Sequence, residues 1–344
     1  MKFIDSIPNT DKINYLNIGL LAISCLVAFF VPFELFLFSY AVLGPAHYLT
    51  EISWLHERKY FSNGKRDYLL LGAAAVLLFL AAYVLRPQKL MSGEMTLHFS
   101  TALVYIAFLA GLSMVLLKEP FQRFIAFIII CATSVVAKDF VLFFSVFLPT
   151  LIHVYVFTGL FMLYGALKAK STSGYWTFAV FLLCPILFFV VGTDGTAVTE
   201  YALKAYPNFQ VLNIESIKLW DIDIFGQFDP QINAVYQSSF GIILMRFIAF
   251  AYTYHYLNWF SKTTVIKWHE VPKKRLAIIA VLWIASVAFY LYNYRLGFHV
   301  LFLLSFLHVF LEFPLNHVTI IGIGKEISAM RKGTQPAVVK GKRK

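Results

Sequence analysis

The sequence predicts an all-α protein, a polytopic integral membrane bundle of about ten transmembrane helices. Of its 344 residues, 60% are hydrophobic and 14% are charged, and the mean hydropathy is +0.72. Soluble proteins carry about 25% charged residues, and one water-soluble core cannot cover so many apolar side chains. The composition excludes a disordered chain, and the three cysteines lie inside apolar runs, which excludes a disulfide scaffold. The solvent for most of the chain is therefore lipid.

Apolar runs of about 17–25 residues, the length that crosses a bilayer, define the predicted helices. The first run is followed directly by a second, without a small-residue cleavage site, so we interpret it as a retained helix and not as a signal peptide. Between the fifth and sixth runs, Lys138-Asp139 either separates two helices or forms an ion pair inside one bent helix. In order, the predicted spans are Ile13–Val31, Phe33–Trp54, Tyr68–Val84, Leu97–Leu117, Phe121–Ala137, Val141–Leu163, Tyr175–Val191, Ser238–Trp259, Leu276–Tyr292 and Gly297–Phe313.

The distribution of basic residues predicts the orientation of these helices. With ten spans, the side that holds both termini carries 22 Lys and Arg residues, and the opposite side carries 6. Because basic residues are retained on the cytoplasmic side, we predict cytoplasmic N and C termini. The net charge of +11 then follows from topology, and we expect membrane lipids as partners and no nucleic acid. We expect the chain in a bacterial inner membrane.

The whole chain, residues 1–344, is predicted to form a single transmembrane domain with two notable segments outside the spans. Residues 192–237 form a long extracytoplasmic connection that holds six acidic residues and two lysines. Connections of this length are usually functional or disordered, so we interpret this one as a structured cap or lid. Residues 325–344 form a basic cytoplasmic tail. The absence of an internal repeat gives no support to an inverted-repeat transport fold.

Ionisable side chains inside the predicted spans indicate a functional site, because such groups are costly in lipid. Two pairs, His47 with Glu51 and His308 with Glu312, are separated by four residues, which places each pair on one helix face. Six groups on four helices fall in the middle or the cytoplasmic half of the membrane, namely His47, Glu51, His153, His255, His308 and Glu312.

Imidazole and carboxylate groups supplied by several helices are typical of a metal centre built inside a bundle. They suit non-haem iron, and also manganese or zinc. We predict a metal site held by His47, His153, His255 and His308, with Glu51 and Glu312 as catalytic carboxylates that orient imidazoles or bridge the metal. One ion and a bridged pair of ions both remain open. Four weaker candidates for supporting residues are His56, His317, Tyr254 and Asn258.

Prolines and aromatic residues surround these histidines. Gly44-Pro45 precedes His47 and Pro149 precedes His153, where proline bends a helix and frees backbone carbonyls. Arg246 lies nine residues before His255 and therefore faces away from it, so we expect it to pair with a carboxylate or a backbone carbonyl. The aromatic residues near His255 either line an apolar substrate pocket or form an interfacial belt; they include Tyr252, Tyr254, Tyr256 and Trp259.

The segment Leu43-Gly-Pro-Ala-His-Tyr-Leu-Thr-Glu51 resembles the first histidine motif of the Brp/Blh family of membrane β-carotene dioxygenases. That motif reads Leu-Gly-x-Pro-His, with an acid four residues after the histidine. Residues 153–159 and 254–259 are similar to later histidine segments of the family. The resemblance implies a polytopic protein that holds iron through His47, His153 and His255 and cleaves a carotenoid into two retinals.

The chain departs from the family pattern in three ways. Pro45 and Ala46 stand in the opposite order, the acid is Glu51 and not aspartate, and no closely spaced second histidine follows His255. We expect His308 to supply the missing ligand.

Together, these features predict an integral-membrane, metal-dependent oxygenase with Fe(II) as cofactor and a lipophilic substrate such as a carotenoid. Two alternatives stay open. The first is a haem-binding electron-transfer protein that uses two of the four buried histidines as axial ligands. The second is a proton- or ion-coupled transporter in which the same His and Glu residues carry the charge. The H-x-x-x-H and H-x-x-H-H boxes of membrane desaturases and hydroxylases do not occur, which argues against those enzymes.

Overall fold

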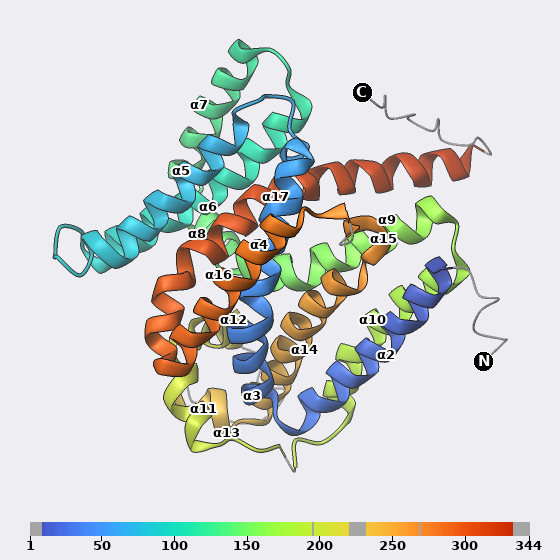
Figure 1. The fold of residues 1–344 in the computed structure, drawn as a ribbon. Coiled ribbons are helices and arrows are strands. Elements are labelled where there is room, and N and C mark those ends of the chain that lie inside the picture. Colours follow the sequence, from blue (N-terminus) through green and yellow to red (C-terminus); the bar gives the residue numbers. More distant parts are fainter. Residues whose placement is uncertain (1–8, 195, 220–231, 268–269, 333–344) are drawn as a thin grey trace.

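The computed structural model describes residues 9–194, 196–219, 232–267 and 270–332, and this part of the chain is built from helices without a strand (Figure 1). The prediction of an all-α fold is confirmed for these residues. Eight helices are long and apolar enough to cross a membrane. They are α2 (Asn9–Phe30), α5 with its π-helical end η3 (Asp67–Leu85), α6 (Gly93–Leu116), the continuous α8, η4 and α9 (Lys138–Ala169), α10 (Thr172–Val190), α14 (Ser239–Ser261), α16 (Lys273–Tyr292) and α17 (Tyr294–Arg331).

The two other predicted spans are also helical. Helix α7 (Pro120–Val136) is apolar and 17 residues long. The helices α3 (Pro32–Phe38), η1 (Ser39–Leu43, a π-helix) and α4 (Gly44–Glu57) follow one another without a break. These two are not among the eight, so ten spans and the cytoplasmic location of both termini stay predictions.

The boundaries of the helices follow local signals. The side chain of Ser92 accepts a hydrogen bond from the amide of Met95 at the start of α6, and Ser238 and Asn293 cap α14 and α17 in the same way. Ala137 has φ −98° and ψ 37°, outside the helical region, so α7 ends before it and a new helix begins at Lys138. Of the two interpretations of Lys138-Asp139, the structure therefore has two separate helices.

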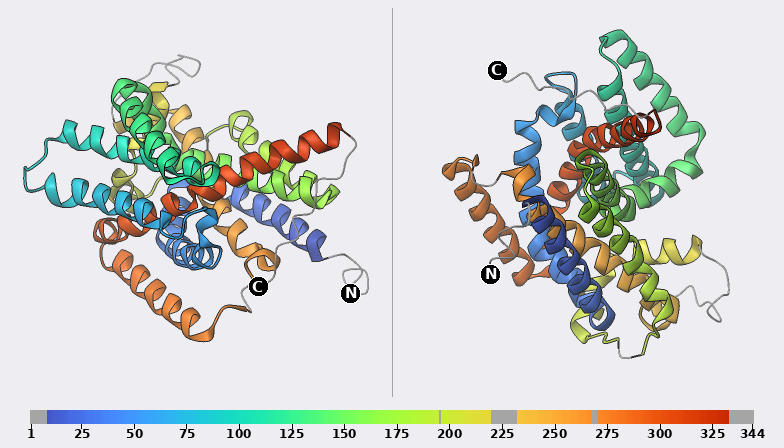
Figure 2. Two further views of the ribbon diagram at one scale, coloured as in Figure 1. Left: turned by 90° about the horizontal axis from the view of Figure 1, so that it is seen from above. Right: turned by 90° about the vertical axis from the view of Figure 1, so that its right-hand side faces the viewer.

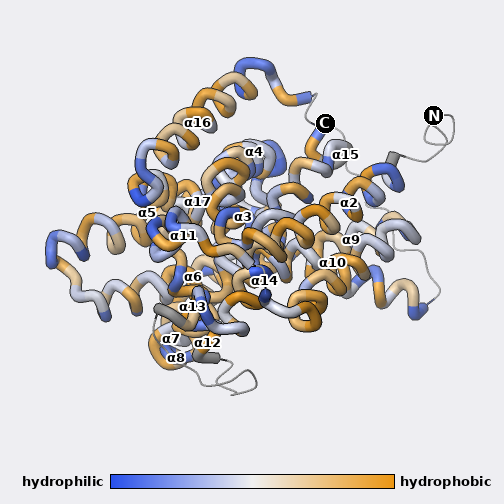
Figure 3. Tube along the Cα trace, turned by 90° about the horizontal axis from the view of Figure 1, so that it is seen from below, coloured by the Kyte–Doolittle hydropathy of each residue, from blue (hydrophilic) through white to orange (hydrophobic). Residues whose placement is uncertain are grey.

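Helix α14 forms the centre of the bundle. It is buried along nearly its whole length and packs against α2 and α3, while α17 packs against α4, α5, α6 and α16 (Figures 1 and 2). Most of α16 is exposed, and its outward side chains are apolar, as expected for a helix whose surroundings are lipid. Hydrophobic residues predominate along α2, α10 and α16, and hydrophilic residues gather toward the ends of α16 (Figure 3).

The long connection between α10 and α14 folds against one end of the bundle, at the lower edge of Figure 1. Its described elements are α11 (Glu200–Ala205), the 3-10 turn η5 (Tyr206–Asn208), α12 (Val211–Leu219) and α13 (Ile232–Gln237). Tyr206 is buried and packs edge-on against Phe33 and Phe36, with ring centroids 5.0 and 5.4 Å apart. These contacts join the connection to α3.

Arg246 of α14 fixes the start of this connection. Its guanidinium donates hydrogen bonds to the carbonyl oxygen of Gly192 (3.0 Å) and to Oγ1 of Thr196 (2.6 Å). It also lies over the ring of Phe29, 5.0 Å from the centroid. Backbone carbonyls thus provide the pairing expected for this residue. In the basic tail, residues up to Arg331 continue α17, and residues 333–344 lie outside the described residues, as do residues 220–231 of the connection.

Candidate metal centre

Irregular helix geometry surrounds two of the four predicted histidine ligands. The π-helix η1 ends just before α4, where the amide of Gly44 donates to the carbonyl of Ser39, and Pro45 has no amide hydrogen to donate. A second π-helix, η4 (Leu148–Phe157), contains Pro149, and its Thr150 has the non-helical angles φ −114° and ψ −109°. Insertions of this kind rotate the following residues and are common at functional sites. They set the directions of His47 and His153, in agreement with the predicted proline bends.

The four predicted histidines meet in the interior. Each is buried, with 6% or less of its surface exposed. Their rings form a closed circuit, in which His47 neighbours His255 (centroids 4.7 Å apart) and His308 (5.3 Å). His153 completes the circuit at 4.9 Å from His255 and 5.2 Å from His308. The structure therefore brings together imidazoles from α4, η4, α14 and α17.

In two neighbouring pairs of this circuit, the Nε2 atoms point toward each other. The Nε2 atoms of His47 and His255 are 3.0 Å apart, and those of His153 and His308 are 3.3 Å apart. Two ligands of one ion at about 2.0–2.1 Å lie about 3.0–3.4 Å from each other in octahedral or tetrahedral geometry. The spacing thus fits nitrogen donors that share one ion.

Within this cluster, two groups of three donors lie close enough to hold an ion, with all ligand atoms of a group within 4.8 Å of one another. One group consists of three imidazoles, from His47, His153 and His255. The other consists of two imidazoles and a carboxylate, from His47, His308 and Glu51. His47 belongs to both groups.

The two buried acids occupy different places. Oε2 of Glu51 lies 3.0 Å from Nε2 of His47, on the side where the ligand atoms gather. Glu312 lies behind the cluster, with its Oε2 3.2 Å from Nδ1 of His153. Among the described residues, the imidazole that Glu312 contacts therefore belongs to His153 of η4. It is not that of His308, which the sequence places on the same face of α17. Apart from these ion-pair contacts, Oε2 of each carboxylate is buried and makes no hydrogen bond within the described residues.

Two residues that the sequence analysis did not propose for the site, Thr158 and Tyr48, contact the imidazoles. Oγ1 of Thr158, the first residue of α9 (Thr158–Ala169), shares a 2.7 Å hydrogen bond with Nδ1 of His255. The ring of Tyr48 stacks on His308, with centroids 4.1 Å apart, and its hydroxyl lies 3.0 Å from that of Tyr256. Thr158 lies five residues after His153 and Tyr48 directly follows His47, but no sequence pattern reveals contacts made between helices.

The four weaker candidates lie in other surroundings. His56 is exposed, and its Nδ1 is 3.1 Å from the hydroxyl of Tyr60. His317 hydrogen-bonds the carbonyl of Phe108 on α6 at 2.8 Å. The hydroxyl of Tyr254 donates to Oδ1 of Asn17 on α2 at 3.1 Å. These three partners lie outside the histidine cluster. Asn258 is buried, and its Oδ1 has no hydrogen-bond partner among the described residues.

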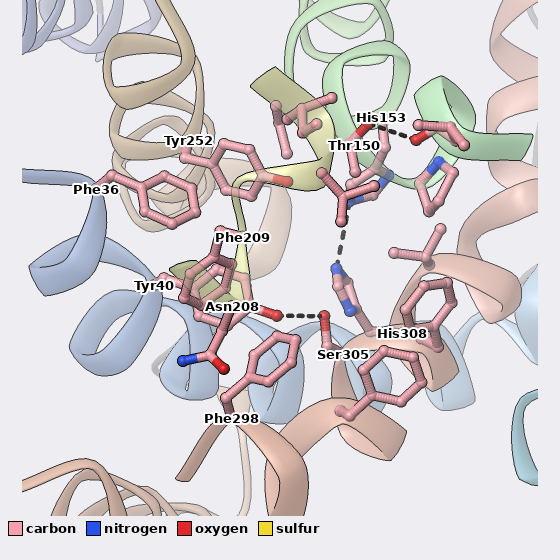
Figure 4. Close-up of a pocket in the computed structure, with 18 of the residues that line it drawn as sticks. Phe36, Tyr40, Thr150, His153, Asn208, Phe209, Tyr252, Phe298, Ser305 and His308 are labelled. Carbon is pink, nitrogen blue, oxygen red and sulfur yellow. Dashed lines mark hydrogen bonds between the residues drawn. The ribbon is translucent and has the colours of Figure 1, made fainter. Parts of the chain in front are cut away.

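A pocket of about 300 Å³ leads to the cluster (Figure 4). His153 and His308 lie at one end, and Asn208 and Phe209 of the long connection lie toward the other. No charged side chain lines the pocket in the described part of the chain. Its walls come from seven elements and the connection and are rich in aromatic rings; these belong to Phe36, Tyr40, Tyr48, Tyr206, Phe209, Tyr252, Tyr256, Phe298, Phe302 and Phe306.

Comparison with known proteins found no matching family model, no matching curated protein and no matching solved structure. The resemblance to the Brp/Blh family therefore stays a prediction based on the three histidine segments.

Proposed function

We propose that the chain is an integral-membrane, metal-dependent oxygenase that acts on a lipophilic substrate such as a carotenoid, in a bacterial inner membrane. The observation that carries the proposal is the meeting of four imidazoles and the carboxylate of Glu51 at the inner end of an aromatic, uncharged pocket.

The donor set fits a non-haem ferrous ion. Nitrogen and carboxylate donors with positions left open are the usual ligands of ferrous oxygenases. The unpartnered Oε2 atoms of Glu51 and Glu312 support the fit, because buried polar atoms normally have a hydrogen-bond partner or a cation. Together the two carboxylates would neutralise the charge of one divalent ion, which lipid does not tolerate bare. When bound, such an ion activates dioxygen at an open coordination position.

The residues of the chain perform the remaining tasks. The aromatic walls bind an apolar substrate without any charged contact and exclude water from the histidines. A volume of about 300 Å³ is at the lower end for ligand sites, so the pocket holds the reacting part of a long polyene while the rest extends outside. The carboxylate of Glu312, 3.2 Å from Nδ1 of His153, and the hydroxyl of Thr158, which shares a hydrogen bond with Nδ1 of His255, would hold these two imidazoles in place.

The geometry favours a non-haem iron ion over a haem group. A porphyrin between two axial imidazoles separates their nitrogens by about 4 Å, because each lies about 2 Å from the iron. The Nε2 separations of His47 and His255 (3.0 Å) and of His153 and His308 (3.3 Å) are shorter than this, so neither of these two pairs leaves room for the macrocycle.

Elemental analysis and the optical spectrum of detergent-purified protein test the proposal. We expect about one iron per chain, no Soret band, and oxygen uptake when a polyene is added. Metal-free, folded protein would refute the metal centre and favour the transporter alternative. A strong Soret band would instead favour the haem alternative.

A further inference from the structure

The two donor groups of the proposed metal centre have one residue in common. His153 and His255 belong only to the first group, and Glu51 and His308 only to the second. His47 alone belongs to both. The distances place its Nε2 at the overlap, 3.0 Å from Nε2 of His255 and 3.0 Å from Oε2 of Glu51.

On this basis, and resting on the proposed metal centre, we infer that the site holds one ion with His47 as its constant ligand, and that the other donors form two halves with different metal preferences. The nitrogen half consists of His153 and His255, and the mixed half consists of Glu51 and His308. An imidazole nitrogen has one lone pair and binds one ion at a time. Two ions therefore cannot occupy both groups through Nε2 of His47 at once, which favours one ion over the bridged pair.

The two halves differ in chemistry. Three imidazoles form the set typical of zinc, as in zinc enzymes that keep a fourth position open. Two imidazoles and one carboxylate form the set typical of ferrous oxygenases. A substitution in the mixed half should therefore lower the affinity for Fe(II) more than that for Zn(II). A substitution in the nitrogen half should lower the affinity for Zn(II) more.

Charge favours the mixed half for an ion in the native protein. An ion held only by neutral imidazoles keeps a charge of about +2 in a region that lipid surrounds, whereas the carboxylate of Glu51 removes one unit of it by direct contact. Glu312 supplies a second negative charge from behind His153. It orients a ligand and is not itself a ligand.

The experiment measures metal affinity and not turnover. Detergent-purified protein is stripped with a chelator, reloaded with Fe(II) under anaerobic conditions or with Zn(II), and desalted, and the bound metal is determined by elemental analysis. The variants are His47→Gln, Glu51→Gln and His255→Ala, with His56→Ala as the control for loss of a histidine outside the cluster. Helical content and elution as a single species show that each variant is folded.

We expect about one equivalent of either ion in the wild type and in His56→Ala. His47→Gln should lower the affinity for both ions by at least about tenfold. Glu51→Gln should weaken Fe(II) binding by at least about tenfold and Zn(II) binding by clearly less, and His255→Ala should weaken Zn(II) binding more than Fe(II) binding. Because each of these two variants keeps one ion, retained binding shows that its loss of the other is not a failure to fold.

Three results would overturn the inference. These are two equivalents of metal in the wild type, equal losses of both ions in Glu51→Gln and His255→Ala, or a His47→Gln variant that is folded and keeps either ion at wild-type affinity. A wild type that binds neither ion would instead refute the proposed metal centre itself.

Discussion

The hydrogen bond between Thr158 and His255 allows a quantitative test of how the protein holds its imidazoles. In Thr158→Val a methyl group replaces the hydroxyl with little change in volume. Both residues are buried and their polar atoms are 2.7 Å apart, so no water is available to replace the lost partner. When Nε2 of His255 binds the proposed ion, its Nδ1 carries the hydrogen and donates it to Oγ1 of Thr158.

The expected loss follows from this geometry. A buried donor left without its partner costs about 1–3 kcal/mol, and partners that orient a metal ligand contribute about 10- to 100-fold in affinity. Because His255 belongs to the nitrogen half, we expect Thr158→Val to weaken Zn(II) binding by about 10- to 100-fold. Helical content should not change.

The assay is a competition titration of the stripped protein with Zn(II) and a chromophoric chelator. Thr158→Ser keeps a hydroxyl and should therefore retain most of the wild-type affinity for Zn(II). Thr101→Val is the matched control, because Oγ1 of Thr101 donates to the carbonyl of Leu97 in its own helix at 2.9 Å. Unchanged zinc affinity in Thr158→Val, or an equal loss in Thr101→Val, would refute the reasoning.

Three further outcomes follow from the structure. Gly44→Ala places a methyl group 3.0 Å from the hydroxyl of Tyr48, so we expect destabilisation of about 1–3 kcal/mol, measured by thermal unfolding; unchanged stability would contradict the close packing. Arg246→Met removes the hydrogen bonds that hold the start of the long connection, so limited proteolysis should cut residues 192–219 several-fold faster, and an unchanged rate would contradict the anchoring role. Phe209→Trp puts a larger ring into the pocket and should weaken binding of a fluorescent polyene without changing metal content; unchanged binding would exclude the pocket as the substrate site.

The positions of most long helices follow from the sequence, although α17 continues through Pro314 to Arg331, past the predicted end at Phe313. Apolar runs and local capping residues decide where a helix begins and ends, because each backbone hydrogen bond in a helix joins residues only four positions apart. For this reason the predicted span Tyr175–Val191 and the observed α10 (Thr172–Val190) nearly coincide. The helical segments that carry His47, His153, His255 and His308 follow from the same local rule.

The sequence left the partners of these residues open, and only the tertiary structure assigns them. The spacing of four residues placed Glu312 on one helix face with His308. The carboxylate of Glu312 nevertheless lies against His153, which belongs to a different segment. Likewise, no local pattern indicates that Thr158 contacts His255, or that residues after Tyr206 close the pocket. Such contacts depend on the rotation and crossing of whole helices, which the π-helical segments and prolines of η1 and η4 alter. These rotations are settled by packing between segments that lie far apart in the chain, 97 residues for Thr158 and His255, whereas helix formation depends only on near neighbours.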